Sequence, residues 1–184
     1  MTSTSVIFAG FGGQGVLMAG KLLAEAGLLE GKNVAWIPSY GPEMRGGTAN
    51  CTVVVADEIV GSPIIPHPDH LVVLNLPSLD KFEAEMCPGG ELVINSALIE
   101  RKCARNDVKD SYVEGNTIAT ELDNPRGLNI VMLGAFVART ELVKLESVKE
   151  VLAHVFSGPK EKFLAGNLKA LEKGYESGKG VEAA

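Results

Sequence analysis

Ser5-Val-Ile-Phe-Ala-Gly-Phe-Gly-Gly-Gln-Gly15 is the stretch that decides the fold class of this chain. Its apolar first half, Ser5–Ala9, predicts a strand that runs directly into a glycine loop. Apolar residues at helical spacing then predict a helix over Gln14–Leu29, and a second strand follows over Asn33–Pro38. A strand, loop, helix and strand within about thirty residues form a βαβ unit, which implies parallel strands joined by a right-handed crossover.

The remaining segments extend this unit into one α/β domain. The pattern predicts further strands over 49–56, 70–75 and 91–95, weaker strands over 111–113 and 117–119, and helices over 128–139, 147–156 and 160–175. We therefore expect a Rossmann-like, mainly parallel sheet with helices on both faces and a helical C-terminal region. Residues 1–184 are expected to form this single domain, with disorder over 176–184 because that tail is rich in glycine and charge.

Composition narrows the functional classes. The 184 residues carry a net charge of −6 and are 46% hydrophobic, which fits a soluble globular protein. The acidic balance argues against a nucleic-acid or anionic-membrane binder, since phosphate contacts need a basic surface. No signal peptide or membrane span is expected, and the chain is expected to be cytoplasmic. Cys51, Cys87 and Cys103 stand far apart, so they predict reduced structural thiols rather than a disulfide framework, a zinc ribbon or a four-thiolate iron–sulfur site.

The glycine loop matches G-x-G-x-x-G, with glycines at 10, 12 and 15, between a predicted strand and a predicted helix. In that pattern Gly10 would make the turn, Gly12 would let backbone approach a phosphate, and Gly15 would permit helix–strand packing. Ordinary dinucleotide binding also needs a carboxylate at the end of the second strand, and none stands there. Binding of another phosphate group, or a tight turn that only packs against another chain, remain the alternatives.

A second loop, Ser39-Tyr-Gly-Pro-Glu-Met-Arg-Gly-Gly47, follows the second predicted strand. The guanidinium of Arg45 suits a carboxylate or phosphate, although a solvated arginine or a salt bridge with Glu43 would explain it equally well. Loops after parallel strands emerge at the carboxyl edge of a sheet, so we expect the two loops to be neighbours. The candidate ligand or subunit-contact residues are Gly10, Gly12, Gly13, Gln14, Gly15, Tyr40, Gly41, Pro42, Glu43, Arg45, Gly46 and Gly47.

No other stretch predicts a reactive centre. His67-Pro-Asp-His70 places two imidazoles near a carboxylate, and a polar loop is favoured there over a metal site. No Ser-His-Asp order, nucleophile elbow or Walker lysine is present. We therefore predict no catalytic and no metal-binding residue in this chain.

Three stretches together resemble a known family: GFGGQGVLMAGKLLAEAG at 10–27, SYGPEMRGG at 39–47 and NIVMLGAF at 129–136. They are similar to the gamma subunit of the 2-oxoacid:ferredoxin oxidoreductases, over roughly residues 5–175. The resemblance implies a complex that converts a 2-oxoacid, such as pyruvate, 2-oxoglutarate or ketoisovalerate, to acyl-coenzyme A while reducing ferredoxin. It does not indicate which 2-oxoacid, nor the stoichiometry.

The resemblance also implies a division of labour. Thiamine diphosphate, Mg²⁺, iron–sulfur clusters and coenzyme A would belong to the assembled complex, with no cofactor bound by this chain alone. Its partners would be alpha and beta subunits, with a ferredoxin-like delta subunit as a further candidate, and ferredoxin would be reached through the complex. The isolated chain should be inactive and should form a homodimer. The alternatives are a free-standing Rossmann-type nucleotide-binding oxidoreductase and a purely structural scaffold.

Overall fold

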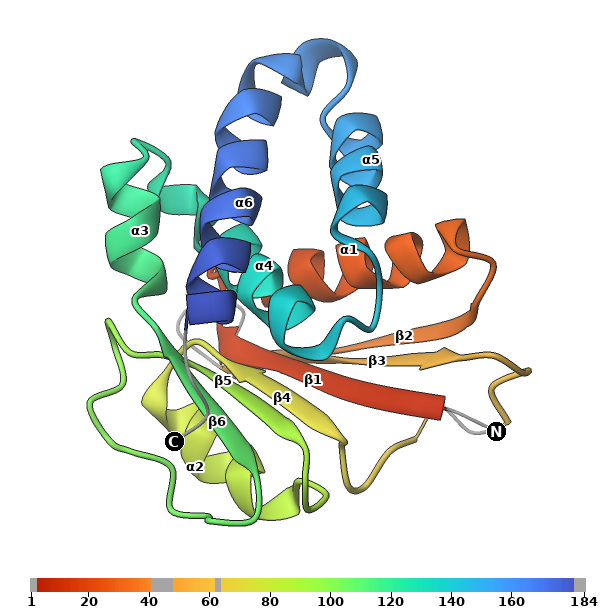
Figure 1. Ribbon diagram of the computed structural model, residues 1–184, viewed down its shortest axis with the longest axis vertical. Helices are drawn as coiled ribbons and strands as arrows, with labels where there is room; N and C mark the ends of the chain where they lie inside the picture. The colour runs from red at the N-terminus through yellow and green to blue at the C-terminus, as the bar shows by residue number, and fades with distance from the viewer. Residues whose placement is uncertain (1–2, 41–47, 62–63, 181–184) are drawn as a thin grey trace.

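A six-stranded sheet runs through the centre of the molecule in the computed structural model, which describes residues 3–40, 48–61 and 64–180 (Figure 1). The strands are β1 (Ser3–Phe11), β2 (Asn33–Tyr40), β3 (Thr48–Ala56), β4 (His70–Val73), β5 (Glu91–Asn95) and β6 (Lys109–Val113). The helices are α1 (Val16–Leu29), α2 (Leu76–Phe82), α3 (Gly115–Glu121), α4 (Leu128–Thr140), α5 (Leu145–Val155) and α6 (Leu164–Gly180), with short 3-10 helices η1 (Glu83–Glu85), η2 (Pro125–Gly127) and η3 (Gly158–Phe163).

The strand order is β2-β3-β1-β4-β5-β6, and only β3 runs against the others. β1, β4, β5 and β6 pair in parallel, as the sequence predicts. The βαβ unit of β1, α1 and β2 is also present, but its two strands do not pair with each other. β3 lies between them and is antiparallel to both.

Two apolar cores, one on each face of the sheet, hold the layers together. Side chains alternate along β1. Val6 and Phe8 point into the core shared with α1, α4, α5 and α6, and Ile7 and Ala9 point into the core between the sheet and α2. Figure 1 shows the same division, with α2 alone below the sheet and the C-terminal helices above it. The expected helices on both faces are therefore confirmed, although the two layers are unequal.

Two sequence-based expectations are wrong. Residues 117–119 belong to helix α3 and not to a strand, because Ala119 is buried and Ile118 packs against the core shared with α4. Residues 176–180 continue α6 and are not a disordered tail. Gly178 accounts for that extension, since it is buried and a Cβ there would lie 2.6 Å from the carbonyl oxygen of Ala135 in α4. Residues 181–184 lie outside the described part of the chain.

Helices α4 and α6 cross at backbone distance. A Cβ added to Gly134 would lie 2.2 Å from the carbonyl oxygen of Leu171, and one added to Gly174 would lie 1.9 Å from that of Val131. The opposing atoms belong to the backbone and cannot rotate away as a side-chain end could. The two glycines therefore set the spacing of the helix layer above the sheet.

Gly174→Ala is expected to destabilise the chain by about 1–3 kcal/mol, since the steric cost exceeds the gain of roughly 1 kcal/mol in helix propensity. Gly166→Ala is the matched control on the same helix, because its Cβ would meet nothing closer than 3.6 Å. That variant should be neutral or slightly stabilising. Urea unfolding followed by circular dichroism measures both, and equal midpoints for the two variants would contradict the close approach.

A network of ion pairs and hydrogen bonds borders the core between the sheet and α2. Arg101 donates to Asp80 and to Glu83, each at 2.9 Å, and the N–H of Ala104 donates to the other Glu83 oxygen at 2.6 Å. The Glu83 side chain is only 9% exposed. Burial opposes its ionisation, but the hydrogen bonds from Arg101 and Ala104 outweigh that effect and hold the pKa of Glu83 below its ordinary value. The network ties the 96–108 segment to α2 and η1.

Glu83→Gln should lower the free energy of unfolding at pH 7 by roughly 1–3 kcal/mol, because Arg101 loses a charged partner. The folded pKa of Glu83 lies below the unfolded one, so its contribution is present above the unfolded value and is lost as the pH falls through the folded value. The difference between wild type and variant should therefore shrink below about pH 4. Urea titrations at pH 7 and at acid pH measure it. Asp107→Asn removes an exposed carboxylate that pairs with the partly buried Arg105, and it should cost less than Glu83→Gln at pH 7.

Candidate glycine-loop site at the carboxyl edge of the sheet

The glycine loop links the end of β1 to the start of α1, at the edge where the parallel strands end. β1 runs through Phe11, a turn covers Gly12 and Gly13, and α1 begins at Val16. The neighbouring strand β4 leads into α2 on the opposite face of the sheet. The chain therefore leaves β1 and β4 towards opposite faces, and the crevice between such strand ends is where ligands of open α/β sheets bind.

The glycines of the motif serve roles that differ from those expected. Gly10 is the last buried residue of β1, where a Cβ would meet the Gln14 side chain at 2.7 Å. The turn is instead made at Gly13, with φ 98°, and at Gly15, with φ 78° and ψ 18°. Both are left-handed conformations that favour glycine. Gly15 precedes the first residue of α1 in this left-handed conformation. The sequence pattern instead predicts that Gly15 permits helix–strand packing.

Gln14 closes the loop. Its Oε1 accepts a hydrogen bond from the N–H of Phe11 at 2.7 Å, and its own N–H donates to the carbonyl of Phe11 at 3.1 Å. Its Nε2 donates to the carbonyl of Leu74 at the end of β4, at 3.5 Å. One side chain thus joins both ends of the turn to the neighbouring strand.

Several backbone donors at the loop have no partner within the described part of the chain. These are the N–H groups of Gly12, Gly13 and Gly15, together with those of the first three residues of α1. The first turn of α1 also contains no acidic residue. Free N–H groups at the positive end of a 14-residue helix favour an anion. On a chain with a net charge of −6, this is a local anion-accepting surface.

Most of the second predicted loop lies outside the described residues. Gly41, Pro42, Glu43, Arg45, Gly46 and Gly47 lie outside the described residues, and of Tyr40 only the backbone position in β2 is described. The strands that flank this loop do reach the same edge. Ala49 pairs with both Tyr40 and Gly10, and Thr48 pairs with Phe11. The proximity of the two loops stays a prediction, and the strand register supports it.

The polar stretch from His67 to His70 lies at the opposite, amino edge of β4. Nδ1 of His67 is 3.0 Å from the carbonyl oxygen of Glu85, Asp69 accepts hydrogen bonds from Ser5, and Nδ1 of His70 accepts from the N–H of Glu91. Burial lowers the pKa of His70. In the described residues no three His, Cys, Asp or Glu side chains are grouped so that they could hold a metal ion.

The cysteines are free, and Cys51 is buried beneath α1. Burial raises its pKa to about 12, and burial also raises the pKa of Cys103 to about 11. Both thiols are therefore protonated at neutral pH and unsuited to nucleophilic chemistry. No helix in the described part of the chain combines the length and the apolar character that a membrane crossing needs.

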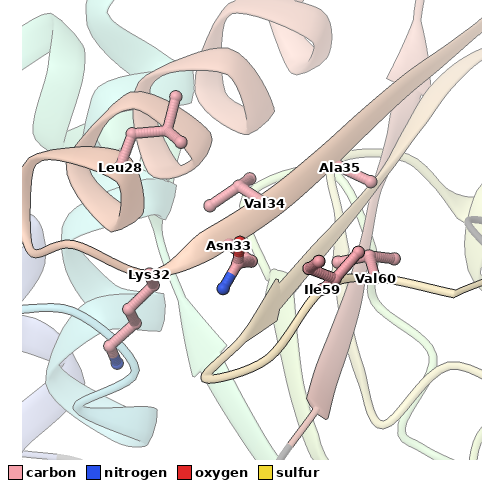
Figure 2. A pocket seen from close by; sticks show the side chains of 7 residues that line it. All are labelled: Leu28, Lys32, Asn33, Val34, Ala35, Ile59 and Val60. Atoms are coloured by element: carbon pink, nitrogen blue, oxygen red, sulfur yellow. The ribbon is translucent and has the colours of Figure 1, made fainter.

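A hollow of about 360 Å³ lies where α1 ends and β2 begins (Figure 2), whereas the glycine loop lies at the start of α1. The end of α1, the start of β2 and the segment after β3 line it, through Leu28, Lys32, Asn33, Val34, Ala35, Ile59 and Val60. Its charged side chain, Lys32, donates to the carbonyl of Leu142 at 2.7 Å. Apart from Lys32 and Asn33 the lining side chains are apolar, and the Lys32 ammonium is already bound to a backbone carbonyl.

Asn129 opens the third family stretch, and its position in the sequence predicts no role for it. The structure places it in α4, where its Nδ2 donates to the carbonyl of Gly15 at 3.1 Å. The sequence does contain one signal for such a role, because Asn129 is a polar residue at the start of the otherwise apolar helical run NIVMLGAF. The contact joins residues 114 positions apart, which no local pattern predicts.

The chain as a whole is similar to proteins of a known family. Ketoisovalerate oxidoreductase subunit VorA of Methanothermobacter thermautotrophicus is 43% identical over 173 residues, which cover 93% of this chain but 35% of VorA. The chain thus spans about a third of the length of that relative. The crystal structure of the gamma subunit of a keto/oxoacid ferredoxin oxidoreductase from Geobacter sulfurreducens superposes with a TM-score of 0.84 at 32% identity and covers 97% of both chains.

A second solved structure matches the whole chain within a longer one. It is the 2-oxoglutarate:ferredoxin oxidoreductase from Magnetococcus marinus, described with 2-oxoglutarate, coenzyme A and succinyl-CoA bound, with a TM-score of 0.91, 25% identity, and coverage of 100% of this chain and 32% of that one. The model of the pyruvate ferredoxin/flavodoxin oxidoreductase family matches residues 5–177, from the start of β1 to near the end of α6. On this match the chain belongs to the pyruvate ferredoxin/flavodoxin oxidoreductase family.

Proposed function

We propose that this chain is the gamma subunit of a multi-subunit, thiamine-diphosphate-dependent 2-oxoacid:ferredoxin oxidoreductase. Its task is to complete the assembly and to present the glycine loop to an anionic group of coenzyme A or of the substrate. The observation that carries the proposal is the set of unpartnered N–H groups at the start of α1, in a chain that matches a gamma subunit from end to end. The complex would act in the cytoplasm, as the free cysteines suggest.

The residues of this chain support a binding role more than a catalytic one. The described part offers no clustered metal ligands, and the thiols of Cys51 and Cys103 are protonated at neutral pH. By analogy with the family, thiamine diphosphate, Mg²⁺ and the iron–sulfur clusters would be held by alpha, beta and ferredoxin-like delta subunits, with ferredoxin as acceptor. Coenzyme A, when bound, supplies the thiol that accepts the acyl group. This chain would hold its phosphates at the glycine loop and orient it.

Strand order weighs against the alternative of a free-standing nucleotide-binding oxidoreductase. In that fold the strand next to β1 carries the carboxylate that holds the adenosine ribose. Here β3 occupies that place and runs in the opposite direction, so the end of β2 lies two strands, or about 10 Å, away. Titration of the isolated chain with NAD or NADP separates the two functions, because micromolar binding would favour the alternative.

Arg45→Ala is expected to lower turnover of the correctly assembled complex about tenfold to a hundredfold. This is the effect of losing one charged hydrogen bond, worth roughly 1.5–3 kcal/mol. Arg45→Lys keeps the charge but loses the planar fork, and should fall between wild type and Arg45→Ala. Steady-state kinetics with coenzyme A and a panel of 2-oxoacids measure all three. Lys160→Ala, an exposed cation in η3, is the control, and wild-type kinetics for Arg45→Ala would remove the functional role.

The purified chain, without its partners, should self-associate, most simply as a two-fold dimer. Its mean hydropathy is +0.15, and Leu28, Ile59 and Ile64 expose large apolar side chains, with Ile59 at 88%. Surface of this kind is usually covered in an assembly. Light scattering at tens of micromolar, roughly the range in which moderate association is visible, measures the state. A strict monomer would contradict the expectation.

A further inference from the structure

The third family stretch begins with a residue that reaches the glycine loop. Asn129 is the second residue of α4 and is 6% exposed. Its Nδ2 donates to the carbonyl of Gly15, which also accepts the N–H of Ala19 at 3.0 Å as the first hydrogen bond of α1. Asn129 and α1 thus share one carbonyl as their acceptor.

The Asn129 side chain also packs on the backbone of Gly15. A Cβ built there would lie 2.7 Å from both Cγ and Nδ2 of Asn129. Gly15 already needs its left-handed φ of 78°, so conformation and contact both demand glycine at this point. The loop is therefore fixed at its two ends by two amides, Gln14 at the β1 end and Asn129 at the α1 end.

This contact also sets the direction of a free donor. A planar trans peptide holds its C=O and N–H groups pointing in opposite directions. Because Asn129 and Ala19 fix the carbonyl of Gly15 towards the protein, the N–H of Val16 in the same peptide must point away from these partners. That N–H is among the unpartnered donors at the start of α1. Asn129 can therefore influence an anion at the loop without touching it.

We propose that Asn129 is a positioning residue for the glycine-loop anion site: it fixes the Gly15–Val16 peptide so that the free N–H groups face the phosphates of coenzyme A. The inference rests on the proposed function of the loop. α4 does not need Asn129 for its own packing, because Val131, Met132 and Gly134 already bury it against the core and α6. The hydrogen bond to the Gly15 carbonyl explains why a polar side chain occupies this buried position.

Two variants in the assembled complex test the role. Asn129→Ala removes the donor, and the isosteric Asn129→Asp keeps the shape but faces the Gly15 carbonyl with a carboxylate. Hydrogen-exchange mass spectrometry of the peptide over residues 8–18 reports the loop, and steady-state kinetics report the KM for coenzyme A. We expect faster loop exchange and a KM for coenzyme A raised about threefold to tenfold, the effect of one neutral hydrogen bond. The KM for the 2-oxoacid should stay within about twofold.

Asn129→Asp should raise the KM for coenzyme A further than Asn129→Ala, since it adds a negative charge beside the bound anion, and salt should reduce that excess. Ser5→Ala is the matched control. Ser5 is buried, and its hydroxyl both donates to Asp69 at 2.7 Å and accepts from the N–H of Asp69 at 3.0 Å, at the opposite end of β1. It should cost stability without changing loop exchange or the KM for coenzyme A.

If the Asn129 variants showed the same rate of amide hydrogen exchange over residues 8–18 as the Ser5→Ala control, the inference would be overturned and the proposed function would be unaffected. Faster exchange with an unchanged KM for coenzyme A would also overturn it. The Arg45→Ala complex then separates the two failures. If that variant lowers turnover as expected, only the role of Asn129 is lost; if its kinetics are those of the wild type, the proposed anion contact at the two loops fails as well.

Discussion

The position of β1 is the constraint on which the rest of the structure depends. This strand pairs along its whole length with β3 on one side, and over Val6–Ala9 with β4 on the other. Six of its nine residues are buried, four of them in the two apolar cores. A slip by one residue would exchange Val6 and Phe8 with Ile7 and Ala9 between the cores. The strand register also fixes the position of the glycine loop, because the loop begins at the last residues of β1.

An acidic chain can hold an anion only where its own charges are kept away. At the start of α1 the donors are backbone N–H groups, and the first turn has no carboxylate. The groups that fix the loop, Gln14 and Asn129, are neutral amides, which orient the backbone without adding negative charge. The acidic network around Glu83 lies on the α2 face of the sheet, where Arg101 pairs with both Asp80 and Glu83. The charge distribution is thus compatible with a phosphate at the loop.

Local patterns predicted the parts of this fold that local forces determine. The apolar runs of β1, β4 and β5 and the long helical spacing of α1 and α4 were identified because burial on one or two faces sets their periods. Placement of β3 between β1 and β2 was not predicted, since pairing partners depend on contacts between distant segments. The helix at 117–119 and the extension of α6 to Gly180 were missed for the same reason. Tertiary packing against α4 determines both.

The site was predicted in outline but not in its mechanism. G-x-G-x-x-G identified the loop, yet the motif assigns the turn to Gly10, whereas Gly13 and Gly15 carry the positive φ values. Only the fold shows this, because the inserted β3 keeps Gly10 within the pairing of β1. Arg45 and its neighbours stay predictions, since they lie outside the described residues. Asn129 needed the structure, as its contact with Gly15 spans 114 positions.

A site built from backbone donors also fits the way this family varies. The relatives are named for different 2-oxoacids, ketoisovalerate in VorA and 2-oxoglutarate in the Magnetococcus enzyme, although this chain matches both over more than nine tenths of its length. Discrimination between such acids requires side chains shaped to one substrate. Backbone N–H groups at a helix start recognise a phosphate whatever the oxoacid. The geometry of the loop is therefore better suited to the proposed contact with coenzyme A, which the Magnetococcus enzyme binds, than to the selection of one oxoacid.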